Sequence, residues 1–187
     1  FSIPLVLGGL GLALGFRAGL FNIGGNGQII FGALAAVWVG FAMNLPPVVH
    51  TLVALLAAMV AASLYAGIAG VLKAKTGANE VIVTIMLNSI ATLALGYILS
   101  KKSWQVPGSN QPQTPKVADS AAFTRILDAP FKIHVGLFVA LLAVIVFWWL
   151  IERSTLGFEI RAVGANPDAA RTAGISVGKI TAITMAI

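Results

Sequence analysis

Apolar residues in this chain form long uninterrupted runs rather than the short alternations of a soluble core. No Lys, Arg, Asp or Glu occurs from Ala18 to Leu72, and none occurs from residue 133 to residue 151. A helix needs about 20 apolar residues to cross about 30 Å of hydrocarbon, so the first run is long enough for two crossings with a break between them. A soluble helix would show a polar face over such a length. The pattern therefore predicts a helical membrane protein.

Five full membrane spans are predicted, followed by the beginning of a sixth near residue 177. The expected fold class is all-α, a polytopic transmembrane helical bundle. Pro46 and Pro47 should break the chain between the second and third spans. Because the sequence starts at Phe1 rather than Met and stops inside an apolar run, residues 1–187 are expected to be part of a longer transmembrane domain. The five predicted spans are 2–16, 23–43, 50–72, 79–99 and 133–151.

Composition and charge agree with this class. Hydrophobic residues make up 58% of the chain and charged residues only 10%, whereas a soluble domain carries about 25% charged residues. Lys and Arg at the ends of spans account for the net charge of +6.

Nucleic-acid binding would need a basic patch with interleaved aromatics, and none is visible. Without cysteine there are no disulfides, thiol catalysis or cysteine-based metal sites, and neither HExxH nor an acidic cluster predicts another metal site.

Basic residues give the expected orientation. Alternating spans place seven Lys and Arg in short segments on one side and five in the single loop 100–132 on the other. Short loops rich in Lys and Arg favour the cytoplasm. We therefore expect 153–176 to be a cytoplasmic loop and 100–132 to be an extracytoplasmic loop, with a short helix around 118–128.

A polar, helix-weakening octet, FNIGGNGQ, interrupts the first apolar run at residues 21–28. Backbone groups at membrane depth must be paired or must line water or protein. Its glycines permit positive φ, and its amide side chains can cap exposed backbone groups. A tight turn between ordinary spans and a break that lines a solute path both remain open. The residues concerned are Asn22, Gly24, Gly25, Asn26, Gly27 and Gln28.

The third and fourth spans carry different stripes. Small residues recur every fourth position from Ala54 to Gly70, which predicts close packing of two helix backbones. In the fourth span, Thr84, Asn88 and Thr92 should face the bundle interior or a cavity, because polar groups facing lipid are costly. They could make interhelical hydrogen bonds, line a transport path, or both. Glu80, in the first turn of that span, is expected to be solvated and to favour the positive helix end.

A short capped helix is predicted inside 153–176. Asn166 suits the N-cap, Pro167 the first helical position and Asp168 the positive end, while Gly174 is placed to stop the helix. Arg171 adds a charged side chain to this helix, which a partner could bind. Such a helix could dock into a partner's groove or could be a connector that contacts nothing.

Three segments carry a resemblance to a known family: GLFNIGGNGQ (19–28), NEVIVTIMLNSIA (79–91) and TLGFEIRAVGANPDAARTAGIS (155–176). Together they resemble the permease subunits of bacterial ABC importers, in the branch for nucleosides and simple sugars, which is related to the branched-chain amino acid and ribose permeases. The resemblance implies part of a type II importer-like permease. It implies a multi-pass protein of the bacterial cell membrane that translocates an uncharged polar solute, a nucleoside first and a simple sugar as the alternative.

The resemblance also implies partners. They are an ATP-binding subunit, a second permease subunit in a homo- or heterodimer, an extracellular substrate-binding lipoprotein and the lipid bilayer, without nucleic acid. The chain itself would be no enzyme and hold no cofactor, because the partner would bind ATP–Mg. The translocation pathway would involve Asn22, Gly24, Gly25, Asn26, Gly27, Gln28, Thr84, Asn88 and Thr92. Coupling to the ATPase would involve Arg161, Gly164, Asn166, Pro167, Asp168, Ala170, Arg171 and Gly174.

Other function classes find less support in the sequence. An ion-coupled secondary transporter would need an ionisable group at mid-depth, and Glu80 lies at a span end. GISVGKIT (174–181) resembles a phosphate loop only faintly. The pattern GxxxxGK[ST] would need Gly at 173 and Ser or Thr at 180, where this chain has Ala173 and Ile180, so ATP would have to be bound by a partner. His50 and His134 fall at span ends, where we expect solvated histidines rather than catalytic ones.

Overall fold

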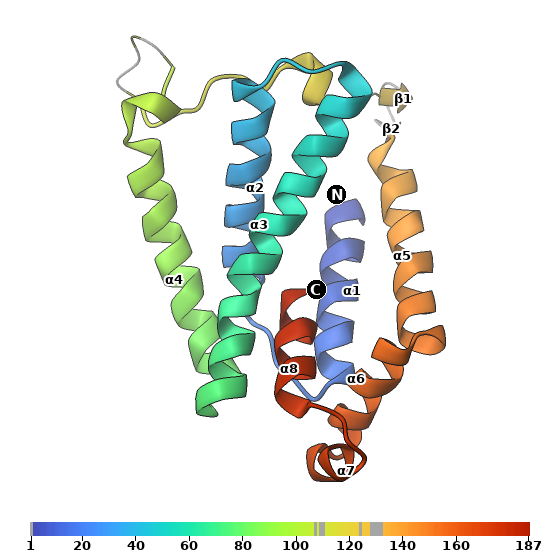
Figure 1. Cartoon of the computed structure of the whole chain (residues 1–187). Helices are drawn as coiled ribbons and strands as arrows, with labels where there is room; N and C mark the ends of the chain where they lie inside the picture. The colour runs from blue at the N-terminus through green and yellow to red at the C-terminus, as the bar shows by residue number, and fades with distance from the viewer. Residues whose placement is uncertain (1, 107, 109–110, 124, 128–132) are drawn as a thin grey trace. The chain divides into compact units, whose positions relative to one another are not determined.

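The computed structural model describes residues 2–106, 108, 111–123, 125–127 and 133–187, and these residues are mostly helical (Figure 1). The predicted all-α class is confirmed. The helices are α1 (Ser2–Arg17), α2 (Gly25–Ala42), α3 (Pro47–Thr76), α4 (Glu80–Leu99), α5 (Gly136–Arg153), α6 (Thr155–Ala165), α7 (Pro167–Thr172) and α8 (Val177–Ala186).

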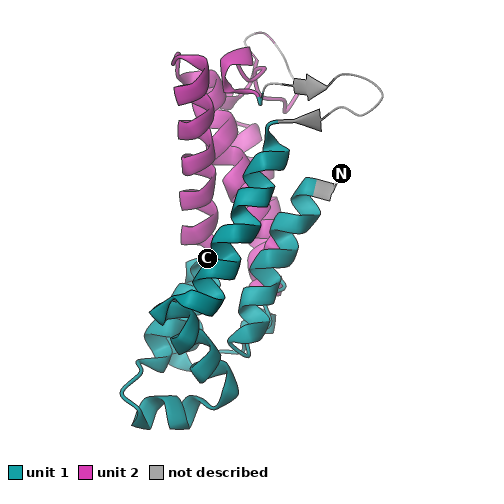
Figure 2. Ribbon diagram, turned by 90° about the vertical axis from the view of Figure 1, so that its right-hand side faces the viewer, with its two compact units in different colours: residues 1–23, 66–83, 123–187 teal, residues 24–65, 84–122 magenta. Residues whose placement is uncertain are grey.

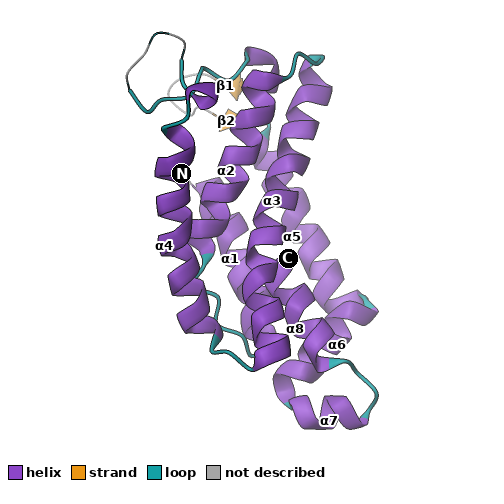
Figure 3. Ribbon diagram, turned by 60° about the vertical axis from the view of Figure 1, so that its left-hand side comes forward, coloured by secondary structure: helices purple, strands orange, loops and turns teal. Residues whose placement is uncertain are grey.

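The segment between α4 and α5 holds short elements (Figure 3). They are two 3₁₀ turns, η1 (Lys102–Trp104) and η2 (Asp119–Ala121), and a small ribbon of β1 (Arg125–Leu127) and β2 (Ile133–His134). The helix expected around 118–128 is therefore wrong: the backbone of β1 pairs antiparallel with β2, which a helix would prevent. Within loop 100–132, residues 107, 109–110, 124 and 128–132 lie outside the described residues.

Four described helices are long and apolar enough to cross a membrane: α2, α3, α4 and α5. Shorter apolar helices cover Ile3–Arg17 and Val177–Ala186, which are α1 and α8. These six helices lie where the five spans and the start of a sixth are predicted. Many large apolar side chains on them are exposed, for example Leu93 at 75% and Leu64 at 71%, as expected for helices whose outer faces meet lipid.

The chain divides into two compact units (Figure 2). Unit 1 contains residues 1–23, 66–83 and 123–187, and unit 2 contains residues 24–65 and 84–122. In unit 1, α6 contacts α1, α5, α7 and α8. Its Ile160 and Val163 are buried, being 1% and 3% exposed. The position of α6 places the segment around α7 next to the end of α1.

The predicted small-residue ridge of α3 packs closely within each unit. In unit 1, a Cβ on Gly70 would come within 2.9 Å of the Ala182 Cα in α8. In unit 2, a Cβ on Gly32 of α2 would lie 3.2 Å from the Ala58 carbonyl oxygen and 3.5 Å from the Ala62 Cβ. The expectation of close backbone approach along this ridge is confirmed, and van der Waals packing is the interaction it provides.

Candidate functional site

The chain leaves helical geometry just before and within the octet. Gly19, at φ +70°, ends α1: its N–H bonds to the Phe16 carbonyl at 3.1 Å, and the Leu20 N–H bonds to the Gly15 carbonyl at 2.9 Å. This is a Schellman C-cap, in which glycine accepts the left-handed conformation. Residues 20–24 are not helical, and α2 begins at Gly25. The octet is therefore a break followed by a new helix start.

The first turn of α2 is capped by another helix. Its N-cap residue, Gly24, has no side chain and makes no side-chain cap bond. Instead, the Asn88 Oδ1 atom in α4 accepts a hydrogen bond from the Gly27 N–H at 2.8 Å. Gly27 is the third helical residue, whose amide an N-cap side chain would ordinarily satisfy. Within unit 2 the structure thus brings together two of the predicted pathway residues.

Gly27 lies where α2, α3 and α4 meet. A Cβ there would lie 2.9 Å from the Tyr65 ring, 3.2 Å from the Asn88 Oδ1 and 3.3 Å from the Ala91 Cβ. The Tyr65 hydroxyl donates to the Leu87 carbonyl at 2.6 Å, and its ring stacks on Phe31 with centroids 4.1 Å apart. Sequence reasoning missed Tyr65, because a lone tyrosine in an apolar run carries no local signal of its partner.

The polar stripe of α4 does not stay on one face. Thr84 is 1% exposed and Asn88 is half-buried, but Thr92 is exposed and its hydroxyl donates to the Asn88 carbonyl of its own helix. At 100° per residue, Thr92 is rotated about 80° from Thr84, whereas Ala91 is only about 20° away. Ala91 is accordingly the fully buried one, at 0% exposed. Of the remaining predicted pathway residues, Asn22, Gly25 and Gln28 are half-buried, Gly24 is buried and Asn26 is exposed.

Glu80 is buried, so the expectation that it is solvated is wrong. It is 8% exposed. Its Oε2 lies 2.5 Å from the Lys73 Nζ, and its Oε1 accepts the Phe21 N–H at 3.4 Å. The ion pair and the backbone amide replace water around the carboxylate, which a buried charge requires. Within unit 1, Glu80 therefore connects the end of α3, the start of α4 and the segment after α1.

The short helix predicted in 153–176 is α7, with the predicted cap and stop. The Asn166 side chain accepts from the Asp168 and Ala169 amides, both at 3.0 Å. Gly174 has φ +86°, and the Ile175 N–H bonds to the Ala170 carbonyl at 3.0 Å, again a Schellman cap. Pro167 is the first helical residue. Asp168 and Arg171 are exposed and 3.0 Å apart, whereas Ala170 is 4% exposed and packs inward.

Helix α6, which precedes α7, is not predicted from the sequence. Ser154 caps it by accepting the Gly157 N–H at 2.9 Å, a signal that N-cap reasoning could have used. The Arg161 guanidinium donates to the Ile151 carbonyl and lies 3.9 Å from a Glu152 carboxylate oxygen. Arg161 therefore holds the corner between α5 and α6.

Gly164 brings α6 against the backbone that follows α1. A Cβ on Gly164 would overlap the Arg17 carbonyl oxygen and lie 3.0 Å from the Ala18 carbonyl carbon. On the other side of this contact, a Cβ on Gly19 would lie 3.6 Å from the Gly164 carbonyl oxygen. Only glycine fits at Gly164 without moving one of the two segments. The loop that carries α7 therefore contacts the start of the break in unit 1.

His50 is fully buried, so its expected solvation is also wrong. Its Nε2 lies 3.0 Å from the Val39 carbonyl oxygen and its Nδ1 lies 2.8 Å from the Ser120 Oγ. Because a carbonyl only accepts, Nε2 donates to Val39, and a neutral imidazole then accepts the Ser120 hydroxyl at Nδ1. The Ala118 N–H also bonds to the Gly40 carbonyl at 2.9 Å. Part of loop 100–132 is thus fixed within unit 2. The side chain of His134 lies outside the described ones.

Comparison with known proteins gives consistent similarities. Residues 1–187 match the family model described as branched-chain amino acid transport system / permease component. The guanosine ABC transporter permease protein NupP of Bacillus subtilis is 44% identical, over 98% of this chain and 53% of NupP. The glucose ABC transporter permease protein TsgB13 of Haloferax volcanii is 38% identical, over 94% of this chain and 48% of its own.

A third relative is the nucleoside ABC transporter permease protein NupB of Lactococcus lactis. It is 32% identical, over 98% of this chain and 52% of its own. The chain spans about half the length of these curated relatives. No solved structure is a significant match.

Proposed function

The chain belongs to the permease-component family of the branched-chain amino acid transport system, and from this premise we propose that it is membrane-spanning machinery of an ATP-driven importer for a nucleoside. The observation that carries the proposal is the similarity to guanosine and nucleoside permeases over nearly the whole chain. The helices long enough to cross a membrane support an integral membrane position. The cell membrane is the proposed location.

The chemistry of the break suits an uncharged solute. Amide and hydroxyl groups gather around it, with Asn88 at the first turn of α2 and Thr84 one turn earlier in α4. Nucleosides present ribose hydroxyls and base edges that pair with such groups. Buried polar groups also reject solutes that would leave them without hydrogen bonds. The proposed pathway residues are those of the octet, Asn22 and 24–28, together with Thr84, Asn88 and Thr92.

A simple sugar is the second candidate, because the chain is 38% identical to a glucose permease. A sugar would use the same hydroxyl-pairing groups. The two candidates differ in the flat aromatic base, which only a nucleoside would bring to the pathway.

Coupling is proposed to pass through α7. Asn166, Asp168 and Arg171 are exposed on this short capped helix while Ala170 packs inward, so one face is available to a groove on a partner. The partner is an ATP-binding subunit that binds ATP–Mg, which puts α7 and loop 153–176 in the cytoplasm. Loop 100–132 would then lie outside, facing a substrate-binding lipoprotein. A second permease subunit, identical or different, would complete the pathway.

The test is uptake by the full-length subunit with its partners in a strain that lacks it. Labelled guanosine should accumulate, and unlabelled nucleosides should compete better than glucose. Uptake should stop on ATP depletion and persist with an uncoupler. Asn88→Ala should reduce uptake, whereas Gly96→Ala in the same helix, where a Cβ meets nothing within 4 Å, should not. Competition by glucose alone would favour the sugar candidate, and uptake driven by the ion gradient would exclude the ATP-driven importer.

A further inference from the structure

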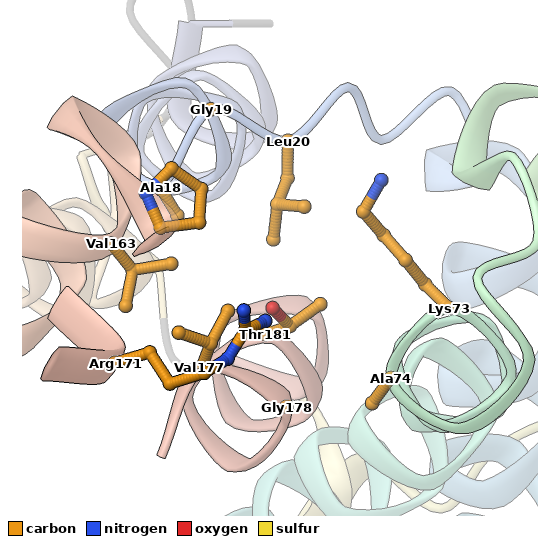
Figure 4. Close-up of a pocket in the computed structure, with 11 residues that line it drawn as sticks. Ala18, Gly19, Leu20, Lys73, Ala74, Val163, Arg171, Val177, Gly178 and Thr181 are labelled. Atoms are coloured by element: carbon orange, nitrogen blue, oxygen red, sulfur yellow. The ribbon is translucent and has the colours of Figure 1, made fainter. Parts of the chain in front are cut away.

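A pocket of about 330 Å³ lies beside α7 within unit 1 (Figure 4). Its lining comes from the segment after α1, the end of α3, α6, α7 and the first turns of α8. Three polar side chains line it: Lys73, Arg171 and Thr181. None of the described residues that line it is acidic. The pocket therefore presents two cationic side chains, each ion-paired with a carboxylate outside the lining, and a hydroxyl to whatever enters it.

The two cations retain donors for a ligand. Arg171 pairs with Asp168 through one guanidinium nitrogen, and the two side chains are 69% and 88% exposed. An exposed pair of this kind contributes little stability, so Arg171 can turn to another acceptor at small cost. Lys73 is held by Glu80, but its ammonium has three N–H donors. The Lys73–Glu80 pair positions this charge at the pocket.

The N-terminus of α8 opens onto the same pocket. Val177 and Gly178, its first two residues, line the pocket. The N-cap residue Ser176 makes no side-chain cap bond, so the first amides of α8 receive no local acceptor. Amides at a helix start carry partial positive charge and favour anions. Gly178 adds no side chain that would shield them.

Thr181 gives an independent indication of a ligand. The residue is 5% exposed, and it lines the pocket one turn into α8. Within the described part of the chain its hydroxyl makes no hydrogen bond. Among the described residues, the fully buried side-chain oxygen without a partner is that of Thr184 and not that of Thr181. The unbonded Thr181 hydroxyl is therefore accessible from the pocket, where a ligand can bond to it. Figure 4 places Thr181 between Val177 and Lys73, around the same cavity as Arg171.

We propose that this pocket binds an anion of the phosphate class, held by the first amides of α8, the Thr181 hydroxyl and the Arg171 and Lys73 side chains. The phosphate belongs to a soluble phosphate ester or to the headgroup of an anionic lipid. Binding is reversible and no bond is made or broken. Because Arg171 belongs to α7, the bound anion fixes α7 against α8. The last step rests on the proposed function: by fixing α7, the anion regulates the coupling of ATP hydrolysis to uptake.

The test measures binding directly, so it does not depend on transport. The full-length subunit, assembled with its partners, is placed in nanodiscs of zwitterionic lipid and titrated with inorganic phosphate, with chloride at equal ionic strength as reference. A second arm uses nanodiscs containing phosphatidic acid. Hydrogen exchange is followed for the amides of residues 177–181. Phosphate should slow this exchange in the first arm if the source is soluble. Protection in the second arm alone identifies a lipid headgroup.

Variants separate the site from general electrostatics. Arg171→Gln and the isosteric Thr181→Val should each weaken protection about tenfold, the effect of one lost hydrogen bond to a charged group. Lys75→Gln and Lys179→Gln remove exposed cations of α3 and α8 that do not line the pocket. These two variants should leave the protection by phosphate unchanged. Equal weakening by these controls, or no protection in either arm, overturns the proposal. Phosphate binding in a subunit that fails to import nucleosides would refute the proposed function and leave the site intact.

Discussion

The side chain of Asn88 in α4 caps the first turn of α2, because its Oδ1 accepts the Gly27 N–H at 2.8 Å. We expect Asn88→Ala to lower the free energy of unfolding by about 0.5–2 kcal/mol, the usual cost of losing an N-cap acceptor. Asn88→Asp keeps an acceptor oxygen and should retain most of the stability. Thermal unfolding of the purified full-length subunit in detergent measures both changes.

The matched control for Asn88 is Thr92→Val, four residues later in the same helix, where the exposed hydroxyl bonds only to its own helix. It should unfold at nearly the wild-type temperature. A loss of stability in Thr92→Val equal to that of Asn88→Ala would mean that the hydrogen bond from the Gly27 N–H to Asn88 makes no specific contribution to the free energy of unfolding.

Gly27→Ala should destabilise the meeting point of α2, α3 and α4. The new methyl would lie 2.9 Å from the Tyr65 ring, and overpacking of this kind costs about 1–3 kcal/mol. The higher helix propensity of Ala offsets up to about 1 kcal/mol of this loss of stability. Gly25→Ala, where a Cβ meets nothing within 4 Å, isolates the propensity term and should not destabilise. Comparing the two unfolding temperatures tests the prediction, and equal temperatures would contradict it.

These interactions mark the limit of what local sequence patterns predict. The Asn166 cap and the Gly174 stop were predictable, since both partners lie within a few residues of each other. Asn88 could be recognised as polar and inward-facing, but its partner Gly27 lies 61 residues away. That pairing depends on how helices pack, which no local propensity encodes.

Buried charges and histidines show the same limit. Glu80 was expected in water because it begins a span, yet Lys73 and the Phe21 amide surround it. His50 was expected in water for the same reason, and its partner Ser120 belongs to a loop 70 residues away. Apolar patterns predict the spans well because the membrane imposes their length. They say nothing about which chain segment folds back over a span end.

His50→Ala should release the segment around Ser120. The substitution leaves a cavity and removes the acceptor of the Ser120 hydroxyl, with an expected cost of about 1–3 kcal/mol for the unpaired group. The Val39 carbonyl loses one of its two donors but keeps the Met43 N–H. Hydrogen exchange of residues 117–122 should quicken, because the Ala118 amide bond to Gly40 then opens more often. Lys116→Gln, an exposed neighbour in the same loop, should leave the exchange unchanged. Wild-type protection in His50→Ala would show that the histidine does not hold this segment.

Gly164→Val should uncouple ATP hydrolysis from uptake in the assembled transporter. Even a Cβ at this position would overlap the Arg17 carbonyl oxygen, so α6 must move away from the backbone that follows α1. On the proposed function, α7 would still engage the ATP-binding subunit, because its own caps at Asn166 and Gly174 are untouched. Hydrolysis should therefore continue while labelled nucleoside uptake falls. Measuring both rates in the same proteoliposomes gives the ratio of uptake to hydrolysis, which should fall.

The control for Gly164→Val is Gly11→Ala in α1, where a Cβ meets nothing within 4 Å; its ratio of uptake to hydrolysis should match the wild type. A variant that merely misfolds would lose both rates together, so the preserved hydrolysis distinguishes uncoupling from unfolding. The contact between Gly164 and Arg17 lies within unit 1 and joins the loop bearing α7 to the end of α1, just before the break. Wild-type uptake in Gly164→Val would mean that movement of α7 does not reach the break through this contact.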